Sequence, residues 1–264
     1  MLSIGGYEMI ETVLWEELKW AEIKELASQN AVVIVPVAST EQHGPHLPVS
    51  TDAKLVTTVA TRVAKAMREG GVPGIVAPTV WTGNSLHHML FPGTISLDYE
   101  VFSRLMLQIC LCINHHGFSR IVLLNGHGGN EGPLRVAITE INQKVGHPVF
   151  GVDYWDPARK EMAEILQVQT GVRHSGEAET SLMLHLYPEL VGDYSASVGP
   201  DRPDPEELSG GMAYTFRTYK DRTRIGVIGD ARPATAEKGK KMLECIVERL
   251  AELFSRPSLW EITL

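Results

Sequence analysis

Four short apolar runs alternate along this chain with longer segments of helical character. The runs favour buried strands and are residues 31–38 (AVVIVPVA), 74–80 (GIVAPTV), 120–124 (RIVLL) and 148–154 (PVFGVDY). The predicted helices are residues 11–29, 53–67, 98–116, 132–144, 157–167, 181–186 and 236–255. This alternation is typical of a largely parallel sheet between helices. With no linker or repeat and 44% hydrophobic residues, we expect one α/β domain over residues 1–264.

Residues 191–230 break the alternation, because they are rich in Pro, Gly, Asp and Ser. We expect loops here, with at most a short hairpin, and Tyr214, Phe216 and Tyr219 among the few aromatic residues. A connection of this length is unusual in a compact domain. Such loops tend to cover an active site or to build subunit contacts.

Charge and composition exclude several classes of partner. The formal net charge is -8, and no cluster of Lys and Arg is present, which argues against binding to nucleic acid or to an anionic membrane surface. No apolar run approaches the roughly 20 residues of a membrane span, and the first 20 residues lack a basic segment followed by an apolar one. We therefore expect a cytoplasmic protein that acts on small molecules. Its cysteines, Cys110, Cys112 and Cys245, are expected to be reduced and buried.

Residues 41–52 (EQHGPHLPVSTD) follow the first predicted strand and lead into a helix. Open α/β sheets bind their ligands in loops at the carboxyl ends of strands. This loop carries Glu41, His43, His46 and Asp52 within twelve residues, and its glycine and prolines bend and stiffen the backbone. Carboxylate oxygens beside imidazole nitrogens suit Zn, Mn or Fe.

Further polar side chains are predicted at the same end of the sheet. His127 lies in the glycine-rich turn after the third strand (NGHGGN), and residues 171–180 supply His174, Glu177 and Glu179 before an apolar helix. These side chains, together with the first loop, are enough for two metal ions that share a bridging carboxylate. Asp52 is the expected bridge.

Each of these residues also has a purely structural explanation. Asp52 can cap the helix that follows it, Glu41 can be a solvated carboxylate, and His43 and His46 can bond to backbone carbonyls. The turn around His127 can be only a tight turn or a phosphate cradle, although it lacks the GxGxxG and GK[ST] patterns. The remaining histidines that we assign to structural roles are His115, His116, His147 and His185. The separate explanations would all have to hold at once, which favours a shared site.

Several segments together resemble the creatininase (creatinine amidohydrolase) family. They are residues 41–52, 91–94 (FPGT), 125–130 (NGHGGN), 174–177 (HSGE), 179–181 (ETS), 226–230 (GVIGD) and 234–239 (ATAEKG). The resemblance implies a three-layer α/β/α fold, a homo-oligomer that is often a hexamer, and two divalent ions that serve to hydrolyse C–N amide bonds. It places one ion on Glu41, Asp52 and His127, and the other on His43 and Asp52.

The chain departs from creatininase at the second ion. Creatininase carries a Tyr-Glu pair after the histidine of the glycine turn, and its Glu binds the second ion, whereas this chain has Gly128 and Gly129. Glu177 is the expected replacement ligand, as in relatives with the Gly-Gly turn. Glu179 is expected to hold a metal-binding side chain in position without binding the metal itself.

The chain also departs from creatininase around the substrate. Of the two tryptophans that enclose the substrate in creatininase, the resemblance keeps Trp155, while Thr170 replaces the other. These departures point away from creatinine itself and towards a related amide. Formamides and peptides, on which relatives act, remain alternative substrate classes.

The resemblance implies a metal-assisted hydrolysis. Two cations lower the pKa of a bridging water from about 15.7 towards ~7, and the resulting hydroxide attacks the amide carbonyl. His174 is the expected proton donor to the leaving nitrogen, acting beside Glu177, and backbone N–H groups around Gly128 and Gly129 are expected to stabilise the oxyanion. The residues expected to shape the substrate pocket are Ser85, His88, Gly128 and Trp155, of which Ser85 and Trp155 also have structural explanations. A metal-dependent peptidase, a lyase or isomerase on the same scaffold, and a metal-free binding protein stay open.

Overall fold

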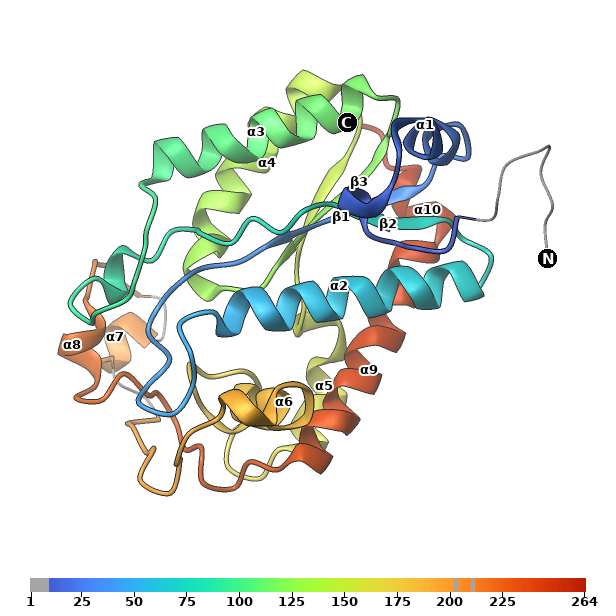
Figure 1. Ribbon diagram of the computed structural model, residues 1–264. Helices are drawn as coiled ribbons and strands as arrows, with labels where there is room; N and C mark the ends of the chain where they lie inside the picture. The colour runs from blue at the N-terminus through green and yellow to red at the C-terminus, as the bar shows by residue number, and fades with distance from the viewer. Residues whose placement is uncertain (1–9, 202–203, 210–211) are drawn as a thin grey trace.

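The computed structural model of the protein describes residues 10–201, 204–209 and 212–264. The first nine residues, which form part of the segment expected to lack a targeting signal, lie outside this description. Four parallel strands form one sheet in the order β2-β1-β3-β4 (Figure 1). The strands are β1 (Val32–Val37), β2 (Gly74–Val76), β3 (Arg120–Asn125) and β4 (Val149–Asp153).

Helices cover both faces of the sheet. Alternate residues of β1 point to opposite sides: Val32 and Ile34 join one apolar core, while Val33 joins the other. The second core is covered by α1 (Trp20–Ser28), α3 (Tyr99–His115) and α4 (Glu131–Val145). The first is covered by α2 (Thr51–Glu69), α5 (Arg159–Ile165), α6 (Glu177–Leu186) and α9 (Ala236–Ser255). The predicted α/β fold with a mostly parallel sheet and three layers is confirmed.

Two predicted elements are shorter than expected. The second strand ends at Val76 rather than at residue 80, because Pro78 has no N–H to donate to a sheet ladder. The first predicted helix is broken into a 3-10 turn, η1 (Trp15–Glu17), and α1, since Lys19 between them has an extended backbone.

The helix before the last predicted loop segment, α6, begins four residues earlier than expected, and this shift affects the site. The prediction started it at residue 181, but α6 begins at Glu177. Gly176 precedes the helix, and the Glu179 carboxylate accepts a hydrogen bond of 2.6 Å from the Ser175 N–H, which stabilises the turn that opens it. Glu177 and Glu179 therefore lie in the first turn of a helix instead of in a loop.

The described parts of residues 191–230 run past the carboxyl ends of the strands as mostly irregular chain, shown in orange in Figure 1. They include the short helices α7 (Glu206–Ser209) and α8 (Tyr219–Arg222). The expected hairpin is absent from the described residues of this segment, where Val198 and Asp230 form an isolated bridge. The remaining short elements are η2 (Leu86–His88), η3 (Gly128–Asn130), η4 (Asp156–Ala158), η5 (Pro188–Leu190) and α10 (Pro257–Trp260).

The three cysteines are free thiols, as expected, but they are not all buried. Cys110 is buried, whereas Cys245 is half-buried and Cys112 is exposed on the outer face of α3. Within the described residues, no helix combines the length and the apolar character needed to cross a membrane.

Candidate metal centre

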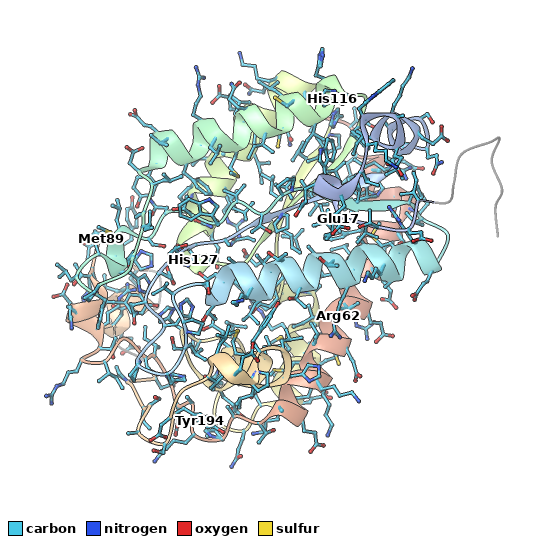
Figure 2. All side chains as sticks on the ribbon, viewed as in Figure 1. Glu17, Arg62, Met89, His116, His127 and Tyr194 are labelled. Atoms are coloured by element: carbon cyan, nitrogen blue, oxygen red, sulfur yellow. The ribbon has the colours of Figure 1, made fainter. Side chains whose placement is uncertain are left out.

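Six acidic and histidine side chains from four segments meet at the carboxyl end of the sheet. Glu41 and His43 follow β1, Asp52 lies in the first turn of α2, and His127 follows β3. His174 and Glu179 flank the start of α6. Figure 2 shows His127 near the beginning of α2, whereas His116 lies at the other end of the molecule. Five of the six are no more than 6% exposed, and the His174 side chain is 9% exposed. Buried carboxylates need a compensating positive charge.

Asp52 faces a histidine with each of its two oxygens. Its Oδ1 lies 3.0 Å from His43 Nε2, and its Oδ2 lies 3.3 Å from His127 Nδ1. Each histidine also faces a second carboxylate: Glu41 Oε1 is 3.2 Å from His127 Nδ1, and Glu179 Oε2 is 3.8 Å from His43 Nε2. The cluster thus has two halves joined by Asp52.

Backbone carbonyls determine which nitrogen of each ring carries a proton. His43 Nδ1 lies 3.1 Å from the Glu41 carbonyl oxygen, His127 Nε2 lies 3.1 Å from that of Asn84, and His174 Nε2 lies 2.8 Å from that of Gln42. Since a carbonyl oxygen can only accept, each facing nitrogen must donate. The opposite nitrogen of each neutral ring therefore turns a lone pair towards a carboxylate.

A lone pair that faces a carboxylate oxygen is stable only with a positive charge between them, either a proton or a metal ion. Glu41 Oε1, His43 Nε2 and Asp52 Oδ2 are buried and have no hydrogen-bond partner, as expected for atoms arranged around a cation. Ligand atoms of Glu41, His43 and Asp52 lie within 4.8 Å of one another, as do those of His43, His174 and Glu179. Carbonyl bonds to the far ring nitrogen are the usual support for metal-binding histidines. The residues present fit a metal site.

The electrostatics also favour a cation. Burial lowers the pKa of His43, but the carboxylates of Asp52, Glu179 and Glu41 together outweigh this effect and raise it to about 10. Burial likewise opposes protonation of His127, while Glu41 and Asp52 raise its pKa well above the usual value. Burial raises the pKa of Glu179 to about 7. A metal ion would replace the protons that this cluster otherwise holds.

Ser85 and His88 support Glu41 instead of lining the pocket, which corrects their predicted role as substrate contacts. The Ser85 hydroxyl donates to Glu41 Oε2 at 2.6 Å, and His88 Nε2 lies 3.3 Å from Glu41 Oε1. Gln42 Nε2, 2.9 Å from His88 Nδ1, in turn orients the His88 ring. Ser85 and His88 are both fully buried and are not among the residues that line the pocket.

Glu177 is not part of the cluster, which corrects its prediction as the replacement ligand. Its Oε1 forms an ion pair of 2.5 Å with Lys238 Nζ on α9. Its two oxygens also accept from the backbone N–H groups of Gln167 and Val168 at 2.9–3.0 Å. Both oxygens are therefore engaged, and the carboxylate that faces His43 belongs to Glu179.

The cluster opens into a pocket of about 550 Å³, and Gly128 and Trp155, two of the residues expected to contact substrate, line it. Further wall residues were not predicted as site residues: His87, Phe216, Arg217, Tyr219 and Arg222. The Tyr219 ring stacks on His88 with centroids 3.8 Å apart and meets the edge of His174 at 4.8 Å. The length of the 191–230 connection and its few aromatic residues were the available signals for this wall.

The other histidines have structural surroundings. His46 Nε2 lies 2.9 Å from the Thr180 hydroxyl, and burial lowers the pKa of His46 to about 4. His147 Nε2 lies 2.9 Å from the Asn114 side-chain oxygen. Like these two, His115, His116 and His185 belong to no metal-competent group among the described residues.

Comparison with known proteins places this geometry in a family. Residues 16–254 match the family model described as Creatininase: Creatinine amidohydrolase. The chain is 32% identical over 261 residues to a mycofactocin precursor peptide peptidase of Mycobacterium tuberculosis, an alignment covering 91% of this chain and 93% of the relative. It is 32% identical over 263 residues to a creatinine amidohydrolase of Pseudomonas putida, covering 92% and 96%. A creatininase mutant structure of the Zn–Zn type superposes with a TM-score of 0.79 at 28% identity, covering 96% of this chain and all of that one. The chain belongs to the creatininase family.

Proposed function

We propose that this protein is a metal-dependent amidohydrolase that cleaves a C–N amide bond of a small molecule. The observation that carries the proposal is the set of three histidine rings whose lone pairs are turned by backbone carbonyls towards Glu41, Asp52 and Glu179. Membership of a family of hydrolases supports it.

Two divalent ions fit the two halves of the cluster. Glu41, Asp52 and His127 would hold one, and His43, Asp52 and Glu179 the other, with Asp52 between them. The mixed oxygen and nitrogen donors suit Zn, Mn or Fe. When bound, such ions supply a Lewis acid for the carbonyl oxygen and a water of lowered pKa.

The chain fits a Gly-Gly variant of the family in which Glu179 takes over the second carboxylate. A side chain at position 129 would overlap His127 Nε2, the Asn84 carbonyl oxygen and the His87 ring. A glutamate from this turn therefore has no room. Glu179 approaches His43 from α6 instead.

His174 is the proposed proton carrier. Burial lowers its pKa well below the usual value, so the ring is neutral and its Nδ1 is free to accept a proton. Nδ1 lies 3.5 Å from Glu41 Oε1, which stabilises the proton once it arrives. From Nδ1 the proton passes to the leaving nitrogen. We expect the backbone N–H groups of Gly128 and Gly129, which line the pocket, to stabilise the oxyanion, and Trp155, which also lines it, to shape the substrate space.

A peptide bond is the second candidate for the bond cleaved. The peptidase relative is as similar to this chain as the creatinine amidohydrolase, at 32% identity each. Product analysis must also distinguish hydrolysis from a metal-dependent lyase or isomerase reaction, and catalysis of any kind from metal-free binding.

The test uses metal-depleted protein reconstituted with Zn, Mn or Fe and assayed for ring-opened product, formate and amine with creatinine, formamidopyrimidines and short peptides. We expect hydrolysis that depends on metal, and loss of turnover in His174→Gln with both ions retained. His147→Gln, which alters a histidine outside the cluster, is the matched control. Hydrolysis by metal-free protein, or no retained metal and no restored activity, would refute the proposal.

We also propose that residues 1–264 act as one cytoplasmic domain and assemble as a homo-oligomer, with a hexamer as the expected form. An apolar segment beside the site supports assembly, because Trp81, Met89, Leu90 and Ile95 are each at least half-exposed. Light scattering coupled to size exclusion tests this, and a monomer at micromolar concentration would contradict it.

A further inference from the structure

One wall of the pocket is built by residues 215–222 and is held in place by several contacts. Thr218 and Asp221 cap each other at α8, with the Thr218 N–H donating to Asp221 Oδ2 at 3.0 Å. Lys220 Nζ lies 3.8 Å from the centre of the Phe91 ring, and Tyr219 stacks on His88. This wall is therefore fixed against the residues that support the metal centre.

The same wall carries more positive than negative charge. Arg217 Nη1 and Arg222 Nε lie 2.7 Å and 3.1 Å from the same oxygen, Oδ1 of Asp204. Two guanidinium groups thus share one carboxylate. They form a cationic region beside a pocket whose acidic lining residues are Glu41, Asp52 and Glu179 of the metal cluster and Glu131 on the far side.

Arg222 has hydrogen-bonding capacity left for a ligand. Asp204 occupies its Nε, while its two terminal nitrogens make no hydrogen bond within the described parts of the chain. Its guanidinium carbon lies 5.9 Å from the Tyr219 ring centre, and its side chain is 25% exposed and lines the pocket. A planar guanidinium with two free nitrogens matches the two oxygens of a carboxylate or phosphate.

The pocket's other charged groups do not supply such a site. Arg159 also lines the pocket, but it is paired with Asp156 and lies near Glu131, whose pKa is raised by burial and by the neighbouring Asp153 and Asp156. That side of the pocket is therefore acidic. Arg222, on the opposite wall, is the arginine whose terminal nitrogens no described residue engages in a hydrogen bond.

We propose that Arg222, beside Arg217, binds an anionic group of the substrate while the amide lies at the metal cluster. Tyr219 separates the two, because it contacts His88 with its ring and lies next to Arg222. The substrate is then an amide that carries a carboxylate or a phosphate away from the bond that is cleaved. This inference rests on the proposed amidohydrolase function and makes Arg222 a specificity-determining residue.

The test measures binding, not turnover, by isothermal titration of the metal-loaded protein. The ligands are hippurate, its neutral analogue hippuramide, and N-benzoyl-2-aminoethyl phosphate, which separate a carboxylate from a phosphate and both from a neutral end. Because hydrogen bonds to charged groups are stronger than neutral ones, we expect one anionic ligand to bind about tenfold to 100-fold more tightly than hippuramide. Arg222→Gln should abolish this preference and Arg222→Lys should retain part of it.

Arg224→Gln is the matched control, because Arg224 is exposed in the same segment and does not line the pocket. Thermal melting checks that each variant is folded. Equal affinity for the three ligands, no binding of any, or a preference that survives Arg222→Gln would overturn the proposal. Anion binding without any hydrolysis would leave the Arg222 site standing and defeat the amidohydrolase function instead.

Discussion

Replacing Lys238 with methionine removes the cation that faces the buried Glu177 carboxylate. Glu177 is fully buried, and its pair with Lys238 Nζ is 2.5 Å long. Breaking a buried ion pair from one side costs about 3–5 kcal/mol, because the remaining charge stays in a medium of low dielectric constant. The backbone N–H groups of Gln167 and Val168 still solvate the carboxylate. We therefore expect the lower end of that range, about 3 kcal/mol, which corresponds to a fall in Tm of roughly 6–12 °C.

Lys240→Met is the matched control on the same helix. Lys240 and Glu244 are each more than 60% exposed, and their 4.0 Å pair is worth little in water. Differential scanning calorimetry of both variants measures the difference, and metal analysis of Glu177→Gln shows whether Glu177 holds an ion. A Tm for Lys238→Met no lower than that for Lys240→Met, or loss of an ion in Glu177→Gln, would refute the structural role of Glu177.

Three further outcomes follow from the geometry of the cluster. Asp52→Asn should lose both ions and Glu179→Gln one of the two, as counted by elemental analysis after dialysis; equal losses would contradict the shared position of Asp52. The pKa of His43 is about 10, because the carboxylates around it, Asp52 first, outweigh the lowering by burial, so metal binding at pH 7 should displace a proton and weaken as the pH falls. Titration calorimetry in buffers of different ionisation heat measures the released proton. Binding without proton release would count against His43 as a ligand. Gly129→Ala should reduce the metal content, because the added methyl group would overlap His127. Gly128→Ala should not, because the nearest atom to a methyl group at that position is 4.0 Å away. Equal metal content in both variants would contradict this packing.

The sheet and the first half of the site were predictable because simple rules govern them. The apolar runs that became β1 and β3 are buried on both faces, and parallel strands place their following loops at one edge. That edge brings Glu41, Asp52 and His127 together.

The choice between Glu177 and Glu179 depended on where a helix begins. Two residues apart on a helix, their side chains point about 200° apart, so one of them can face the cluster and the other α9. The apolar pattern placed the start of this helix at residue 181 and left both glutamates in a loop. The structure starts α6 at Glu177, which directs Glu179 to His43 and Glu177 to Lys238.

The pocket wall could not be predicted from the sequence, for a different reason. Residues 215–222 have no helical or strand periodicity, so their position depends on long-range contacts such as Tyr219 on His88 and Lys220 on Phe91. Ser85 and His88 lie in and beside the short 3-10 turn η2, and the sequence predicted them at the substrate pocket without showing that they contact Glu41.

Anomalous diffraction from crystals grown with Mn or Zn would locate the ions in the cluster. We expect two peaks, one on each side of Asp52, the first between Glu41 and His127 and the second between His43 and Glu179. A map with no peak between these side chains, or with a peak beside Glu177, would contradict the two-ion site.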